Sequence, residues 1–150
     1  MKVPVKVWFD LKHSEGKPKY ETAGAAGMDV RSNVHVVIRP KETVLVPTGI
    51  FMAIPEGFEV QVRPRSGMSL KTKFRVPNSP GTIDADYRGE LCIIAENTDG
   101  SNELVVNVGD RVAQIVIQEV PQIVWDEVIS RDALPSTERG DGGFGSTGTK

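Results

Sequence analysis

The chain has few of the residues that build disulfides, metal cages and membrane spans. Its 150 residues include one cysteine, Cys92, and two histidines, His13 and His35. A single cysteine excludes an intramolecular disulfide and a cysteine-based zinc site, and two histidines are too few for a histidine-rich metal centre. Apolar runs last only a few residues, too short to cross a bilayer, and no secretory signal pattern is present. We therefore expect no membrane partner and a cytoplasmic location, or a nuclear one if the source is eukaryotic or viral.

Neither sign of charge is in clear excess. The chain carries 18 Lys and Arg residues against 20 Asp and Glu residues, a formal net charge of −2. A general nucleic-acid binder needs a basic face, so we expect no nucleic-acid partner. The composition, with 39% hydrophobic residues, is too apolar for a disordered chain. A chain of this length is expected to bury a sufficient core as one domain.

Glycine and proline are abundant instead, with 15 and 10 copies. Both residues interrupt helices and favour turns. Between turn signals, of which Pro47-Thr48-Gly49 is one, apolar and polar residues alternate with a period of two, as they do in half-buried strands. This alternation predicts strands over Val3–Phe9, Val34–Ile38, Phe58–Val62, Val112–Ile117 and Ile123–Ile129.

Turn signals that follow one another closely are about ten residues apart, which predicts an all-β protein with a jelly-roll-like barrel or sandwich. One short helix is predicted over Gly67–Phe74. No linker divides the chain. Residues 1–130 are therefore predicted to form the β-barrel domain, and residues 131–150 a flexible, glycine-rich C-terminal arm or lid of the same domain.

The end of the chain, Glu138–Lys150, has no periodicity, and five of the 15 glycines lie between Gly140 and Gly148. A glycine-rich terminus is typical of a flexible tail. However, the segment also contains arginine, phenylalanine and hydroxyl residues. Glycine exposes backbone N–H groups to phosphate oxygens and arginine supplies a forked cation, so the same segment suits a phosphate-binding lid. The composition leaves both interpretations open.

A second segment suited to phosphate is Pro64–Ser69, which follows a predicted strand and precedes the predicted helix. Free N–H groups at the start of a helix attract phosphate, and Arg65 and Ser66 would add a charge and a hydroxyl. The alternative is an N-cap serine beside a surface arginine. The spacing is not that of a Walker loop.

Carboxylates gather in the segment Gly81–Glu90. In an extended chain Asp84, Asp86, Arg88 and Glu90 would share one side. Such carboxylates can bind hydrated Mg²⁺ or orient a water molecule, or they can form a charged face on an edge strand. Together with the two phosphate-suited segments, they favour a metal-assisted phosphoanhydride hydrolase over a carbohydrate-binding sandwich.

The motifs, taken in order, resemble those of the trimeric dUTP pyrophosphatase (dUTPase) family. They are Ala26–Val30, Pro64–Met68, Gly81–Gly89, Gly109–Gln114 and Arg139–Gly148. The resemblance implies a jelly-roll-like β fold and a homotrimer with three shared active sites. It implies Mg²⁺-assisted hydrolysis of dUTP to dUMP and diphosphate, which limits uracil misincorporation into DNA and supplies dUMP for dTMP synthesis.

The resemblance also implies roles for single residues. Asp84 matches the catalytic aspartate, which orients and deprotonates the water that attacks the α-phosphorus. Tyr87 matches the aromatic residue that packs under the deoxyribose and excludes ribose. Asp29 matches a residue that holds Mg²⁺ through water, the metal being bound mainly by the substrate phosphates. The implied substrate contacts are Asn78, Gly81 and Ile83 for uracil, Arg65, Ser66, Gly67 and Gln114 for the phosphates, and Arg139, Phe144, Gly145, Ser146 and Thr147 in the lid.

The hairpin that would read uracil departs from expectation at Pro77 and Pro80. Proline has no N–H, so Pro80 cannot donate to the base. Two alternatives to a dUTPase stay open on the sequence. One is a dCTP deaminase, or a bifunctional deaminase and dUTPase, on the same fold. The other is a nucleotide-sensing regulatory protein on that fold.

Overall fold

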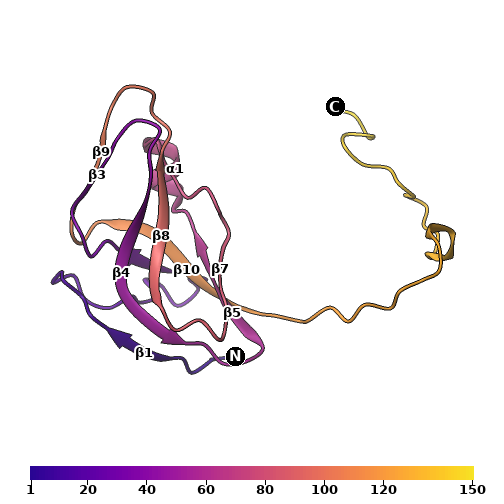
Figure 1. The fold of residues 1–150 in the computed structure, drawn as a ribbon, viewed down its shortest axis with the longest axis horizontal. Coiled ribbons are helices and arrows are strands. Elements are labelled where there is room, and N and C mark those ends of the chain that lie inside the picture. Colours follow the sequence, from indigo (N-terminus) through magenta and orange to yellow (C-terminus); the bar gives the residue numbers. More distant parts are fainter.

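The computed structural model describes all 150 residues as a β-sheet body followed by a long arm (Figure 1). Two four-stranded sheets and a two-stranded ribbon form the body, and every strand pair is antiparallel. The first sheet has the order β1 (Lys6–Phe9), β4 (Thr43–Ala53), β8 (Glu90–Asn97), β6 (Phe74–Arg75). The second has the order β2 (Met28–Arg31), β10 (Arg111–Glu119), β5 (Phe58–Arg63), β7 (Gly81–Ile83). The ribbon pairs β3 (Val36–Ile38) with β9 (Leu104–Val106).

This arrangement confirms the predicted all-β, jelly-roll-like fold. The sheets remain open rather than closing into a continuous barrel. None of the helices has the length and hydrophobicity needed to cross a membrane.

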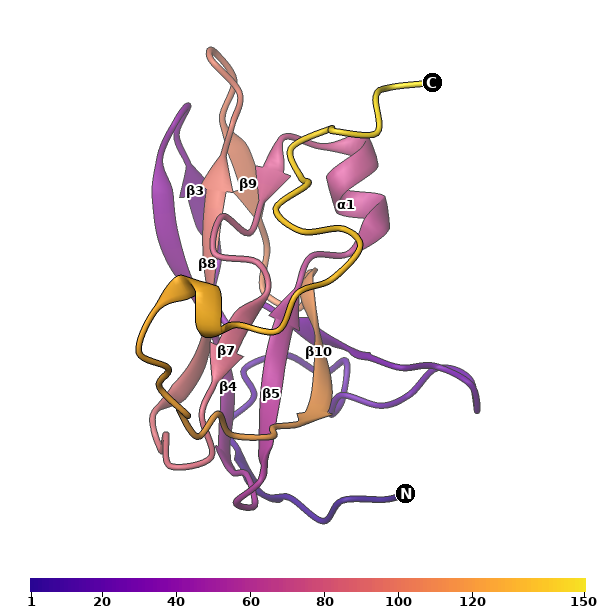
Figure 2. The same cartoon turned by 90° about the vertical axis from the view of Figure 1, so that its right-hand side faces the viewer.

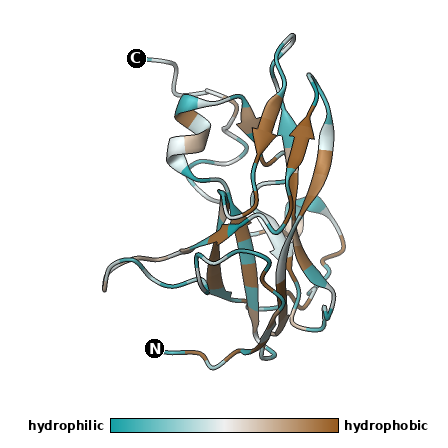
Figure 3. Cartoon of the chain, turned by 90° about the vertical axis from the view of Figure 1, so that its left-hand side faces the viewer, coloured by the Kyte–Doolittle hydropathy of each residue, from teal (hydrophilic) through white to brown (hydrophobic).

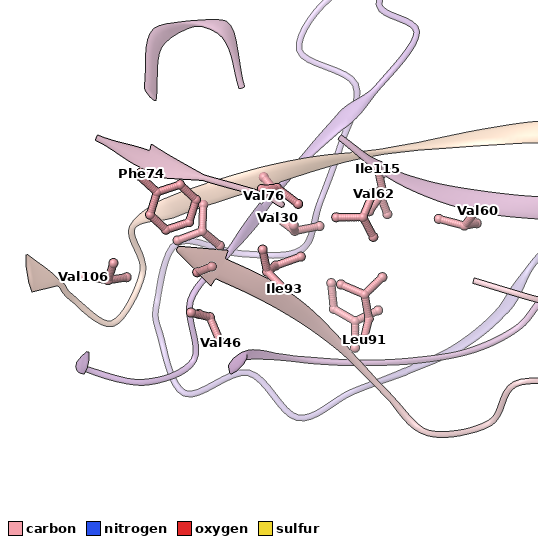
Figure 4. Close-up of a cluster of buried hydrophobic side chains, with 14 of the residues drawn as sticks. Val30, Val46, Val60, Val62, Phe74, Val76, Leu91, Ile93, Val106 and Ile115 are labelled. Carbon is pink, nitrogen blue, oxygen red and sulfur yellow. The ribbon is translucent and has the colours of Figure 1, made fainter. Parts of the chain in front are cut away.

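The two layers are held together by the side chains that point inward, which are every second residue along a strand. In β8 buried and half-buried residues alternate without exception, and Leu91, Ile93 and Ala95 point into the core. Figure 4 shows Leu91 and Ile93 beside Val30 and Val62, which come from the opposite sheet. Figure 3 shows hydrophobic residues concentrated along the strands. Burial of apolar area between the sheets is thus the main force that stabilises the body.

Helix α1 (Ser66–Lys71) is shorter than the predicted Gly67–Phe74, because Phe74 already belongs to β6. Arg65 occupies the N-cap position and makes no side-chain capping bond, so the interpretation of Ser66 as an N-cap is wrong. The helix has no buried residue. Figure 2 shows it at the end toward which β5 points.

The turn predicted at Pro47-Thr48-Gly49 is wrong, because these residues lie inside β4. The strand tolerates them through an irregularity: its register with β8 shifts between Pro47 and Phe51. Thr48 donates its hydroxyl to the Leu91 carbonyl at 2.6 Å, and Gly49 takes a φ of 72° with no room for a Cβ beside the Asp10 carbonyl. Pairing with a neighbouring strand therefore overrides local turn propensity here.

The strand predicted over Ile123–Ile129 does not form in the single chain. The chain leaves the body after β10 and runs away from it, as Figures 1 and 2 show. A strand needs the backbone of a neighbour, and the segment has none. Its apolar side chains are left in solvent, with Trp125 84% exposed. Beyond it lie one 3₁₀ turn, η1 (Arg131–Ala133), and a series of turns whose hydrogen bonds stay within the arm.

Candidate active site

Four residues expected to contact the nucleoside and the expected catalytic aspartate meet in one cavity of about 320 Å³, here called the hairpin pocket. They are Asn78, Gly81, Ile83, Asp84 and Tyr87. The other wall comes from β4 and β8 of the first sheet, through Leu45, Cys92 and Ile94. The pocket thus combines apolar walls with a few polar groups, the usual make-up of a small-molecule site.

The chain turns sharply at the mouth of this pocket. Strand β7 ends at Ile83, and the Tyr87 N–H donates to the Asp84 carbonyl at 3.1 Å, which closes a turn. The expectation of an extended segment with Asp84, Asp86, Arg88 and Glu90 on one side is therefore wrong. Ala85, which an extended chain would place on the opposite side, lines the same open cavity as Asp84 and Asp86.

Cys92 is half-buried in the wall of the hairpin pocket, rather than fully buried as a core residue. Burial raises the pKa of its thiol, and the negative charge of Glu90 raises it further. Because the thiolate is the reactive form of cysteine, Cys92 is suited to packing rather than to nucleophilic chemistry.

A second group of predicted residues lies at the end of β5, around the carboxylate of Asp29. The Arg65 Nε donates to Asp29 Oδ1 at 3.0 Å, and the Arg111 Nε lies 3.4 Å from Asp29 Oδ2. We call these three residues the arginine cluster. Arg111 also lies 3.9 Å from an exposed carboxylate, that of Glu21. Asp29 thus holds two arginines side by side. Its carboxylate neutralises one of the two guanidinium charges, and the remaining positive charge suits an anion such as phosphate.

Gln114 anchors the loop that carries Arg65. In the sheet register it lies opposite both Asp29 and Arg63, so it sits between the strands that support the arginine cluster. Its Nε2 donates to the Pro64 carbonyl at 2.9 Å. Gly27 leaves room for it, because a Cβ at that position would meet the Gln114 Oε1 at 2.7 Å. Sequence reasoning missed this anchoring role, since it depends on strand register.

Ser66 and Gly67 lie exposed in the first turn of α1, next to Arg65. The structure therefore brings Arg65, Ser66, Gly67, Gln114 and Asp29 into one region, as the motifs predict. No residue of this region lines the hairpin pocket. Within one chain the two groups are separate.

The predicted lid residues are in neither region. Arg139 donates from Nε to the Gly142 carbonyl at 2.8 Å, a bond inside the arm. Phe144 is fully exposed and has a φ of 51° between two glycines. Figure 1 shows this part of the arm far from the body. The structure does not bring Arg139, Phe144, Gly145, Ser146 or Thr147 to the pocket.

A family model described as dUTPase matches residues 15–148. The chain belongs to the dUTPase family. It is 51% identical to the deoxyuridine 5'-triphosphate nucleotidohydrolase of Maricaulis maris, with 99% of this chain and 98% of that protein covered. The resemblance drawn from the five motifs is thereby confirmed.

Solved structures of dUTPases show the same fold. One is the Staphylococcus bacteriophage 80alpha dUTPase with dUpNHpp, with a TM-score of 0.83, 26% identity and coverage of 97% of this chain and 99% of that one. Another is a mutant dUTPase from phage phi11 of S. aureus that coordinates a structural Mg(II) ion. Its TM-score is 0.75 at 25% identity, with 86% of this chain and 99% of that one covered.

The arginine cluster leads to a first prediction. Replacing Asp29 by Asn keeps the shape but removes the charge that holds Arg65. A hydrogen bond to a charged group contributes about 1.5–3 kcal/mol, so kcat/KM for dUTP should fall roughly ten- to a hundredfold. Steady-state kinetics on the purified variant measure this change.

The matched control is Glu21→Gln, which removes an exposed carboxylate near the same arginine and should leave kcat/KM within a factor of about two. If kcat/KM fell equally in both variants, or did not fall in Asp29→Asn, the cluster would not position Arg65.

Proposed function

We infer that the chain hydrolyses dUTP to dUMP and diphosphate, as a dUTP diphosphatase that limits uracil in DNA and supplies dUMP for dTMP synthesis. The observation that carries this conclusion is the convergence of Asn78, Asp84 and Tyr87 on the hairpin pocket, in a chain that the dUTPase model matches over residues 15–148. The family match does not favour a same-fold deaminase or a purely regulatory protein.

Asp84 is the proposed catalytic residue. It is exposed and borders both the hairpin pocket and a second open cavity, so water can reach its carboxylate. The carboxylate orients a water molecule and takes its proton while the water oxygen bonds to the α-phosphorus. The bond from that phosphorus to the bridging oxygen breaks, and diphosphate leaves.

The free edge of β7 is the proposed uracil reader. β7 is the last strand of its sheet and pairs only with β5, so its other edge has unpaired backbone N–H and C=O groups. Such an edge can pair with a base as it would with another strand. Asn78 lies beside this strand, because a Cβ on Gly81 would be 3.1 Å from the Asn78 Nδ2. Pro80 lies outside β7, so its missing N–H costs the edge no donor.

Arg65, Ser66, Gly67 and Gln114 are the proposed phosphate contacts, with Asp29 beside them. No group of three or more His, Cys, Asp or Glu residues could hold a metal ion by itself. The residues instead fit a Mg²⁺ ion held mainly by the triphosphate, which Asp29 would help to hold through a water molecule. When bound, the metal neutralises phosphate charge.

A homotrimer with shared sites is the proposed assembly. The site is incomplete in one chain, because the arginine cluster contributes nothing to the hairpin pocket. The single chain also exposes apolar side chains on the outer face of the first sheet. Trp8 is 61% exposed and packs on Phe51 with ring centroids 5.0 Å apart, and Leu45 is 64% exposed. Other copies of the chain would cover these residues and supply the missing half of each site.

The arm is the proposed lid. After a nucleotide binds, Arg139, Ser146 and Thr147 would contact its γ-phosphate. Phe144 and Gly145 would cover the uracil base. The support is the exposure of these side chains and the confinement of the arm's hydrogen bonds to itself, which leave it free to close. Closure would exclude water other than the nucleophile.

The reaction is tested with the wild-type protein and Asp84→Asn. With Mg²⁺, the wild type should release diphosphate from dUTP and far less from UTP, dCTP or dTTP. Asp84→Asn should bind dUTP normally but lose roughly a hundred- to ten-thousandfold in kcat, the usual contribution of a general base. Equal turnover of UTP, or ammonia released from dCTP, would contradict the assignment.

The lid is tested by a chain that ends at Arg131. The deletion removes no strand, so we expect a folded protein of unchanged oligomeric state with less than about a hundredth of the activity, as for other losses of transition-state contacts. Light scattering and dUTP kinetics measure the two properties. A truncated protein that dissociates would mean that the arm is structural, and one that keeps full activity would exclude the lid.

A further inference from the structure

The ring of Tyr87 is packed against Gly89. A Cβ built on Gly89 would meet three atoms of this ring: the hydroxyl oxygen, Cζ at 2.5 Å and Cε2 at 2.9 Å. Real Cβ atoms do not approach other atoms so closely. The ring can therefore occupy its position only while residue 89 has no side chain.

The backbone conformation does not explain why residue 89 is a glycine. The φ of Gly89 lies outside the left-handed region that favours glycine, so an L residue could adopt the same backbone. Gly89 is needed for space rather than for flexibility. This separates it from Gly49, where both the φ of 72° and a nearby carbonyl exclude other residues.

A hydrogen bond fixes the same end of the ring, the end that carries the hydroxyl. The Tyr87 hydroxyl donates to the Glu90 carbonyl at 2.9 Å. Glu90 is itself anchored, because its Oε1 accepts from the Gly49 N–H at 2.8 Å in β4. The acceptor of the tyrosine bond is thus tied to the first sheet.

The backbone on either side cannot easily move aside. The Tyr87 N–H bonds to the Asp84 carbonyl at 3.1 Å, and Arg88 Nη1 donates to the carbonyls of Ala85 at 2.6 Å and Tyr87 at 3.0 Å. A side chain at position 89 would therefore displace the ring, which rotates about single bonds, before it displaced the turn.

We propose that Gly89 is a specificity-determining residue, which positions the Tyr87 ring and so sets the discrimination between deoxyribose and ribose. The inference rests on the proposed function, in which this ring packs under the sugar. A hydroxyl is excluded only if the ring stays where the 2′ position would be. If the ring is pushed into the pocket, dUTP binds more weakly. If the ring swings into solvent, the pocket also accepts UTP. Either movement reduces the preference for dUTP.

The test compares kcat/KM for dUTP and for UTP in Gly89→Ala. We expect the dUTP-to-UTP ratio to fall at least about tenfold. The matched control is Gly100→Ala, where an added Cβ meets nothing within 4 Å, and its ratio should not change. An unchanged ratio in Gly89→Ala would overturn the proposal.

A double-mutant cycle with Tyr87→Ala separates positioning from general damage to the hairpin. If Gly89 acts through the ring, adding Gly89→Ala to Tyr87→Ala should leave the ratio unchanged. A further fall of the dUTP-to-UTP ratio in the double mutant would overturn the proposal, because Gly89→Ala would then act on the ratio without the Tyr87 ring.

The contact itself is measured without turnover. In the wild-type protein, nuclear Overhauser effects should connect the Gly89 α-protons with the Tyr87 ring protons. Their absence would overturn the proposal even if dUTP is hydrolysed. A wild-type protein that shows the contact but hydrolyses no dUTP would instead contradict the proposed function.

Discussion

Strand β5 lies between β10 and β7, and both halves of the candidate site depend on that position. Its pairing with β10 sets Gln114 opposite Arg63, so that the glutamine reaches the Pro64 carbonyl and Asp29 reaches Arg65. Its pairing with β7 leaves the far edge of β7 unpaired. A slip of one residue in either register would turn the functional side chains to the wrong face.

The proposed division of the site between copies of the chain would explain the exposed apolar residues. Trp8 and Leu45 are both exposed in the single chain. Here the hairpin pocket and the arginine cluster lie apart, and the arm lies apart from both. Association of several copies would bury the apolar face and complete the sites in one step, and the arm would then close over bound nucleotide.

The sequence predicts the fold class well, because alternation and motif order are local properties. Phe58–Val62 is found as β5, and the residues expected at uracil do meet in one pocket. The predictions are wrong where the secondary structure depends on pairing with a segment that is distant in the sequence. Pairing with β8 carries β4 through Pro47-Thr48-Gly49, and Ile123–Ile129 has strand character but no partner in its own chain. The contacts of Gln114 with Pro64 and of Tyr87 with Gly89 depend on register and on a tight turn, which no motif reveals.

The claim that each active site combines two copies is tested most directly by mixing Asp84→Asn and Arg65→Ala chains. The two variants are refolded together in equal amounts, with refolded wild type as the control for recovery. Every mixed trimer then contains one site with both intact residues, so about a quarter of wild-type dUTP turnover should return. Turnover that stays at the level of the separate variants would show that each site lies within a single chain.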